Sequence, residues 1–268
     1  MNRLIAFIVA AASSLTAVTA ACAATHIPTP SLTPAPLDAD HALLARVLAR
    51  VVEPDGVDYA ALRADHADLD AYRAQLAEAP IPASGPARMA LFINAYNAWT
   101  LALVLELLPP DEARWPTWSI KDGGGALASV WKRYTFVLGG QRYTLDQAEH
   151  EVLRKMGDPR IHFAINCASK SCPRLAGAPY RAATLEADLE AATRAFVCDP
   201  TQLRAAEGRL AVNPILDWFA ADFERHGGVR AFLLAHVPDG PVNALLTSGS
   251  RLAFFDYDWR LNLARAGR

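Results

Sequence analysis

The chain has 268 residues, of which 52% are hydrophobic and 20% are charged, and its formal net charge is −2. This composition is typical of a globular protein with a packed core. Because Lys and Arg are not in excess and form no basic run, the sequence argues against a nucleic-acid partner.

Residues 1–23 have the pattern of an export signal. Arg3 gives a positive start, an apolar run follows, and the small-x-small sequence ACA ends at Ala23. We therefore expect cleavage after Ala23 and an exported protein, periplasmic if the source is a Gram-negative bacterium. A membrane anchor and lipidation of Cys22 are less favoured alternatives, because the run is short and Thr19 fits a lipoprotein site poorly. We expect no transmembrane segment after the signal.

The rest of the chain predicts a leader and one domain. The Pro- and Thr-rich segment 24–40 is typical of a disordered or extended leader. Residues 41–268 predict a single α+β domain, in which helices pack on a small, mostly antiparallel sheet. The first half of this domain predicts helices at 41–52, 59–79 and 87–108, from apolar spacing and Pro boundaries.

The second half begins with a predicted hairpin at 133–145, where two alternating strands flank Gly139 and Gly140. A helix follows at 144–156, in which Thr144 and Gln147 fit a capping box. The later elements are expected as a strand at 161–166, a helix at 184–198, a strand at 209–213, helices at 214–227 and 228–237, and a strand at 251–262. The residues that we expect to be mostly buried are Phe92, Trp99, Leu103, Phe163, Ile165 and Trp218.

Signal cleavage leaves three cysteines, an odd number for an oxidising compartment, and two of them lie in the stretch IHFAINCASKSCPRL (161–175). Side chains alternate faces along a strand, so Cys167 is expected on the apolar face, buried and inert. Cys172 lies in the loop beyond, where Lys170 and Arg174 favour a thiolate. We therefore expect Cys172 to be the nucleophile, at the edge of a cleft.

A nucleophilic thiol needs a base to activate it. His150 and His162 are the candidates, with Glu149 next to His150 on the predicted helix. A disulfide between Cys167 and Cys172 is an alternative. No metal site is expected, because the cysteine spacing is wider than that of a structural zinc pair and the strand points His162 away from Cys167. No cofactor is expected either.

Asn94 and Asn97 interrupt the most apolar predicted helix and lie near one face of it. A buried amide without partners costs about 1–3 kcal/mol, so both side chains should hydrogen-bond outside their own helix. The loop that carries Cys172, or the closing YDWRLN with Asn262, is the expected partner. These residues are predicted to support a site, or to bind its ligand.

Five runs in this order are LFINAYNAWTL, LGGQRYTLDQAEHEVLR, DPRIHFAINCASKSCPRL, ILDWFAADF and YDWRLN. Together they resemble the domain of unknown function 547 family over about residues 85–262. The resemblance implies a common family but no particular activity. The predicted helix and hairpin are also compatible with a papain- or transglutaminase-like architecture. Those enzymes place a cysteine on the core helix where this chain has Asn94 and Asn97, so their chemistry does not transfer.

Three classes of function remain open. The first is a thiol-dependent hydrolase or acyl transferase, with Cys172 as nucleophile and His150 or His162 as base. The second is a non-catalytic protein that binds an unknown small molecule or peptide. The third is a thiol-redox protein that uses Cys167 and Cys172.

Overall fold

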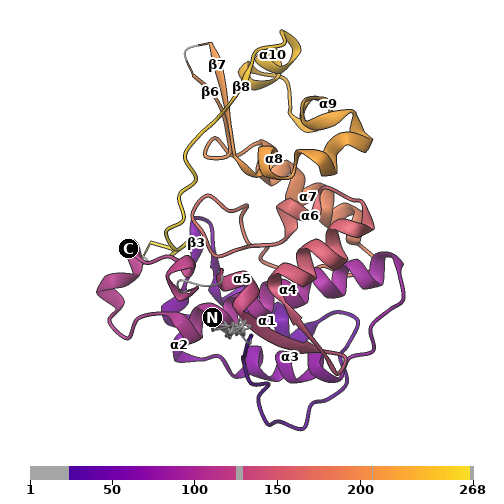
Figure 1. Cartoon of the computed structure of the whole chain (residues 1–268), viewed down its shortest axis with the longest axis vertical. Helices are drawn as coiled ribbons and strands as arrows, with labels where there is room; N and C mark the ends of the chain where they lie inside the picture. Colours follow the sequence, from indigo (N-terminus) through magenta and orange to yellow (C-terminus); the bar gives the residue numbers. More distant parts are fainter. Residues whose placement is uncertain (1–23, 125–128, 207, 266–268) are drawn as a thin grey trace, which may run out of the picture.

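The computed structural model describes residues 24–124, 129–206 and 208–265 (Figure 1). It is an α+β protein, as predicted, with helices around small mixed sheets. The expected export signal and Cys22 lie outside the described residues. A papain- or transglutaminase-like architecture is not confirmed.

The central element is α4 (Gly85–Leu107), on which the lower part of the molecule is built (Figure 1). By length and composition α4 could cross a membrane, which the sequence reading did not anticipate, but 83% of its most apolar window is buried by the rest of the chain. That burial is typical of a core helix. Three shorter helices pack below it: α1 (Ala42–Val51), α2 (Tyr59–Ala64) and α3 (Ala67–Glu78). The predicted helix 59–79 is therefore two helices, because Asp65 is extended.

The predicted hairpin is confirmed as β4 (Tyr134–Leu138) and β5 (Gln141–Thr144), joined at Gly139 and Gly140 with φ 55° and 74°. A positive φ at both turn positions suits glycine and the twist of a two-residue hairpin. The expected leader runs along the domain in an extended path. Its strand β1 (Thr25–His26) pairs parallel with β4, and Ile27 is buried.

The other sheets are short. One pairs β2 (Val52–Glu53) with β3 (Gly56–Val57), and the other has the order β6 (Leu203–Ala206), β7 (Arg209–Val212), β8 (Leu252–Phe254). The strand expected at 251–262 is thus confined to three residues. The remaining short elements of the lower part are the 3₁₀ turns η1 (Glu112–Thr117) and η2 (Ile120–Gly123), and the helix α5 (Val130–Arg133).

The helix expected at 144–156 begins with the predicted reciprocal cap. Thr144 N–H donates to Gln147 Oε1, and Gln147 N–H donates to Thr144 Oγ1. Its body is a wide π-helix, η3 (Gln147–Leu153), which tightens into a 3₁₀ turn, η4 (Arg154–Met156). Wide turns of this kind are frequent at functional sites.

The strand predicted at 161–166 is wrong, because Ile161–Ala164 forms one helical turn, α6. The backbone N–H groups of Ile161 and His162 donate to the carbonyls of Asp158 and Pro159, so Asp-Pro starts a turn. All residues from Ile161 to Asn166 are buried. A short run buried on every side has no periodicity that separates a strand from a helix.

The upper part of the molecule (Figure 1) packs around a second hydrophobic cluster. In this cluster Phe163 stacks on Phe196 with a centroid separation of 4.3 Å. Five of the six residues expected in the core are buried, but Trp218 is 47% exposed and that prediction is wrong. The helices of this part are α7 (Leu185–Val197), α8 (Ile215–Trp218), the 3₁₀ segment η5 (Ala220–His226), α9 (Gly228–His236) and α10 (Pro241–Thr247).

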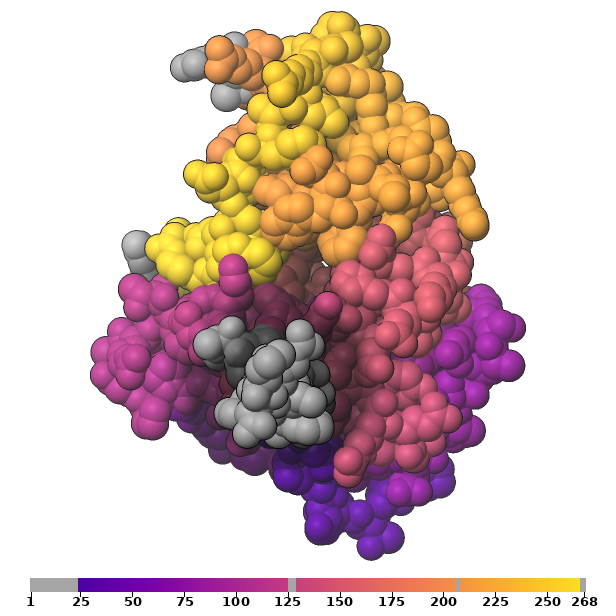
Figure 2. Space-filling model, in the orientation of Figure 1, coloured from indigo at the N-terminus to yellow at the C-terminus, as the bar shows by residue number. Residues whose placement is uncertain are grey.

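The C-terminal segment 255–265 joins the two parts. Figure 2 shows it, in yellow, running from the upper part onto the lower body. Leu261 bridges to Ser169, and Leu263 bridges to Val57. This segment therefore lies against the loop that carries the cysteines, and it closes one side of the candidate site.

Candidate functional site

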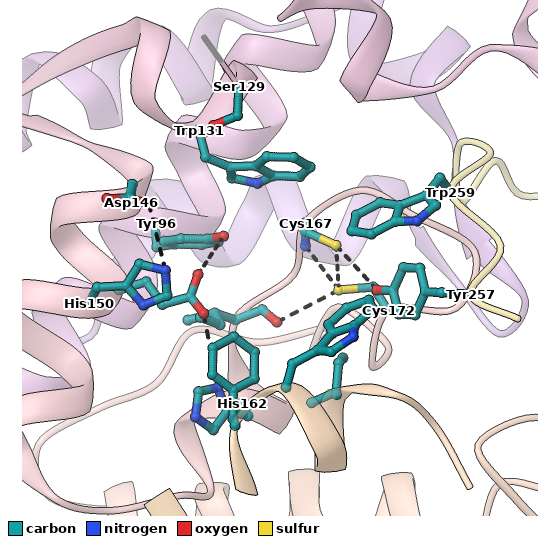
Figure 3. A pocket seen from close by; sticks show the side chains of 15 residues that line it. Tyr96, Ser129, Trp131, Asp146, His150, His162, Cys167, Cys172, Tyr257 and Trp259 are labelled. Atoms are coloured by element: carbon teal, nitrogen blue, oxygen red, sulfur yellow. Dashed lines mark hydrogen bonds and ion pairs between the residues drawn. The ribbon is translucent and has the colours of Figure 1, made fainter. Parts of the chain in front are cut away.

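A cavity of about 190 Å³ lies where α4 and η3 of the lower part face α8 and the C-terminal segment (Figure 3). Both candidate cysteines, both candidate histidines and Glu149 border this cavity. The other residues that line it are Tyr96, Ser129, Trp131, Asp146, Ile165, Ile215, Trp218, Phe219, Tyr257 and Trp259.

The loop 166–173, which carries the cysteines, is held by buried amides. Asn97 accepts from the backbone N–H of Asn166 and donates to the carbonyl of Ala164, at 2.9 and 3.0 Å. Asn166 in turn donates to the Pro173 carbonyl, at 2.7 Å, across the loop. Asn94 makes the same pair of bonds to the backbone of Tyr180. The prediction that Asn94 and Asn97 bond outside their own helix is confirmed.

The C-terminal segment completes the clamp. Asn262 donates to Asn166 Oδ1 at 3.2 Å and accepts from the hydroxyl of Tyr59 at 2.8 Å. Asn213 donates to the Ser171 carbonyl at 2.7 Å. Ala168 sits at φ 63°, a region that disfavours non-glycine residues, with its N–H held by Asn166 Oδ1. A clamped loop with a strained residue is common where a site requires fixed geometry.

Cys167 and Cys172 are in direct contact. Their sulfurs lie 3.0 Å apart, and the backbone N–H of Cys167 also donates to Cys172 Sγ at 3.0 Å. Both thiols are free, because a disulfide bond is about 2.05 Å long. The exposures are the reverse of those predicted, since Cys167 is partly exposed and Cys172 is only 6% exposed.

The two thiols have opposite acidities. The hydrogen bond between the two sulfurs lowers the pKa of Cys167 to about 6 against the effect of burial, with help from the hydroxyls of Ser169 and Tyr257. Those oxygens lie 3.5 and 3.4 Å from Cys167 Sγ. Burial, and then the neighbouring Cys167 thiolate, raise the pKa of Cys172 well above its usual value. At neutral pH the pair is therefore a Cys167 thiolate beside a Cys172 thiol.

Lys170 and Arg174, the cations expected to favour a Cys172 thiolate, do not line the cavity that holds the thiol pair. Arg174 Nε donates to Asp199 at 3.0 Å, and Arg174 also contacts the Pro54 carbonyl. Lys170 is exposed and borders a second cavity on the Asp199 side of the loop, which Cys172 and Arg174 also line. The expected cause of thiolate formation is therefore wrong, because the acidity arises from hydrogen bonds to Cys167 rather than from charges beside Cys172.

Glu149 is a mostly buried carboxyl that lines the cavity, with a side chain only 12% exposed. Burial raises the pKa of Glu149 to about 8, with a further contribution from the Cys167 thiolate. The Tyr96 hydroxyl donates to Glu149 Oε2 at 3.4 Å. The carboxyl is thus protonated at neutral pH and can donate or accept a proton inside the cavity.

His162 is bound to acids rather than to a thiol. Its Nε2 contacts Asp222 Oδ2 at 2.7 Å, its Nδ1 is 4.0 Å from Glu149 Oε1, and its ring stacks on Phe219. Burial lowers the pKa of His162, so the ring is neutral. Hydrogen bonds from His162 and Arg154 outweigh burial and hold the pKa of Asp222 well below its usual range.

His150, like His162, lines the cavity and is hydrogen-bonded to a charged side chain rather than to a thiol. Its Nδ1 accepts from Arg154 at 3.1 Å, since a guanidinium can only donate, and burial lowers its pKa. In the described part of the chain, neither His150 nor His162 is hydrogen-bonded to Cys167 or Cys172. The expected cysteine–histidine pair is therefore not formed.

Residues 82–197 match the model of a family described as "Protein of unknown function, DUF547", and this part of the chain is similar to that family. The match covers α4, η3 and the cysteine loop, and it is shorter than the stretch 85–262 that the sequence motifs indicated. The aromatic wall from α8 and the C-terminal segment lies outside it. No curated protein and no solved structure matches the chain.

Sequence reasoning missed several residues of the site. Asp222 lies in the run ILDWFAADF, and Tyr257 and Trp259 lie in YDWRLN, so all three were within the quoted motifs. The signal that could have identified these three residues was their position within the motifs that carry the family resemblance. Nothing in the spacing of Tyr257 and Trp259 indicated a cavity shared with residues about 90 positions earlier.

Proposed function

We propose that the protein carries out thiol–disulfide exchange, with Cys167 as the attacking thiol and Cys172 as the resolving thiol. The observation that supports this best is the pair itself: two sulfurs 3.0 Å apart, one partly exposed and acidic, the other buried and protonated. Reactive thiols that are accessible, of low pKa and next to a resolving cysteine have this character.

The first step forms a mixed disulfide. The Cys167 thiolate attacks one sulfur of a substrate disulfide, the substrate S–S bond breaks, and the leaving thiolate takes a proton. In the second step Cys172 loses its proton, and its sulfur attacks Cys167 Sγ. The substrate's other sulfur leaves as a thiolate, so the substrate is reduced by two electrons and the Cys167–Cys172 pair is oxidised to a disulfide. The reverse sequence oxidises a dithiol substrate.

Glu149 has the properties of the proton acceptor for the second step. The Cys167 thiolate contributes to its raised pKa, and that charge disappears when the mixed disulfide forms. The pKa of Glu149 then falls, and the carboxylate becomes available to take the Cys172 proton. The Tyr257 hydroxyl, 3.4 Å from Cys167 Sγ, stabilises thiolate charge as the pair exchanges roles.

The test uses a Cys198→Ser background, because Cys198 is exposed and would also react. Treated with bis(2-hydroxyethyl) disulfide, this protein should lose two thiols and gain a Cys167–Cys172 disulfide, seen by peptide mass spectrometry. The added Cys172→Ser change should trap the mixed disulfide on Cys167. Adding Cys167→Ser instead should abolish fast reaction. Absence of both the internal disulfide and the trapped adduct would reject exchange.

A second function is favoured by one observation, the protonated carboxyl of Glu149 in the same cavity as the Cys167 thiolate. Those two groups could support acyl transfer: Cys167 attacks a thioester, Glu149 protonates the leaving thiolate, and water then takes the acyl group from Cys167 as a carboxylic acid. Cys172→Ser separates the two functions. It should stop catalytic turnover of a disulfide after one mixed disulfide, whereas thioester turnover should continue.

A further inference from the structure

We propose that the substrate disulfide carries a positive charge close to its sulfurs, because the cavity beside the thiol pair combines acidic side chains with an aromatic wall. The inference rests on the proposed exchange reaction and names the substrate class of that site. Among the described residues that line the cavity, none is Lys or Arg, and two, Asp146 and Glu149, are carboxylic acids.

The charge inside the cavity is negative at neutral pH. Asp146 and the Cys167 thiolate contribute negative charge, and burial lowers the pKa of both His150 and His162, so neither ring compensates it. Glu149 adds a further negative charge as pH rises through its pKa of about 8. An anionic disulfide therefore meets like charge as it approaches Cys167, and a cationic one meets opposite charge.

Three cations of the described residues, Arg154, Lys132 and Lys121, lie near the cavity but outside its lining, and each has a partner of its own. Arg154 makes two hydrogen bonds to Asp222, at 2.7 and 2.8 Å. Lys132 is mostly exposed and lies 3.7 Å from Asp146, which is a weak pair that a bound cation could replace. These groups reduce the negative charge without removing it.

The aromatic wall suits a cation as well. Trp131 and Trp259 (Figure 3) meet edge to face with centroids 5.7 Å apart. Trp218 stacks on Trp259. Ring faces attract cations and give anions no comparable interaction. Lys121 already shows this behaviour, since its Nζ lies 4.3 Å from the centre of the Trp259 ring.

The volume limits the size of the charged group. About 190 Å³ is space for several water molecules. A two-carbon amine arm of a disulfide fits such a space, whereas a folded protein surface does not enter it. The cationic group is thus a short amine, free or at the end of a flexible chain.

The experiment compares three disulfides of similar length: cystamine (dicationic), bis(2-hydroxyethyl) disulfide (neutral) and 3,3′-dithiodipropionate (dianionic). Second-order rates with the Cys198→Ser protein at pH 7 are divided by the rates of the same compounds with 2-mercaptoethanol. This division removes differences in intrinsic disulfide reactivity. We expect the corrected rate for cystamine to exceed that for dithiodipropionate by about tenfold, and the ratio to shrink in high salt.

Matched variants locate the effect. Asp146→Asn should reduce the ratio, whereas Asp217→Asn, an exposed acid on α8 outside the lining, should not change it. Trp259→Leu should lower the corrected cystamine rate, and Trp259→Phe should retain most of it. The salt dependence needs no variant, so a variant that fails to fold leaves the test intact.

The outcomes separate the two proposals. Equal corrected rates for all three compounds, with the Cys167–Cys172 disulfide still forming, would overturn the charge preference and leave exchange standing. Faster reaction of the dianion would overturn it as well. No reaction with any of the three would reject the exchange function, and the substrate inference with it.

Discussion

Replacing Cys172 by Ala should make Cys167 a weaker acid and a slower nucleophile at neutral pH. The pKa of Cys167 is lowered from 9.0 to about 6, a difference of about 4 kcal/mol at 1.36 kcal/mol per unit. The thiol of Cys172 is the largest of the stabilising groups, ahead of the hydroxyls of Ser169 and Tyr257. Its loss should therefore raise the pKa by about one unit or more.

The assay is alkylation of the folded Cys198→Ser protein with limiting iodoacetamide from about pH 5 to 9, which brackets the usual thiol pKa. Peptide mass spectrometry separates adducts at Cys167 and Cys172. Only the thiolate reacts, so the rate at Cys167 should rise with a midpoint near 6 and then level off. In Cys172→Ala the midpoint should lie at higher pH.

Cys172→Ser is the matched control, because its hydroxyl can still donate to Cys167 Sγ. Its midpoint should lie between those of the wild type and Cys172→Ala. The reasoning would be refuted by a wild-type midpoint near 8.5, the value of a free cysteine, or by a Cys172→Ala midpoint no higher than that of the wild type. Faster labelling of Cys172 than of Cys167 would restore the nucleophile that the sequence indicated.

Three further predictions concern stability and the buried carboxyl. In urea unfolding, Trp99→Ala should cost about 3–5 kcal/mol, whereas Trp218→Ala should cost less than about 1 kcal/mol because Trp218 is half exposed. Asn97→Ala should cost at least about 2 kcal/mol in the same assay, since two buried backbone groups lose their partner; a smaller loss would mean that water replaces the amide. Infrared spectra should show the Glu149 carboxyl titrating near pH 8, and Glu149→Gln should lack this signal. Alkylation of the Cys167 thiolate should lower the midpoint of this titration. An unchanged midpoint would show that Glu149 and Cys167 do not interact.

The sequence by itself determined the elements whose signals are local. The apolar run of α4, the two glycines between β4 and β5, and the cap from Thr144 to Gln147 each depend on residues within a few positions of one another. The two asparagines of α4 were also readable, because a polar amide in an apolar helix must find a partner. The family motifs marked most residues of the site without indicating what they do.

Tertiary structure decided the chemistry of the site. Whether Ile161–Ala164 is a helix or a strand depends on burial from all sides, and that turn leads into the loop that brings both cysteines to the cavity. The acidity of Cys167 comes from Cys172 five positions away and from Tyr257 ninety positions away. Hydrogen bonds and desolvation act over a few ångströms in space, so a thiol pKa depends on neighbours that spacing along the chain does not specify.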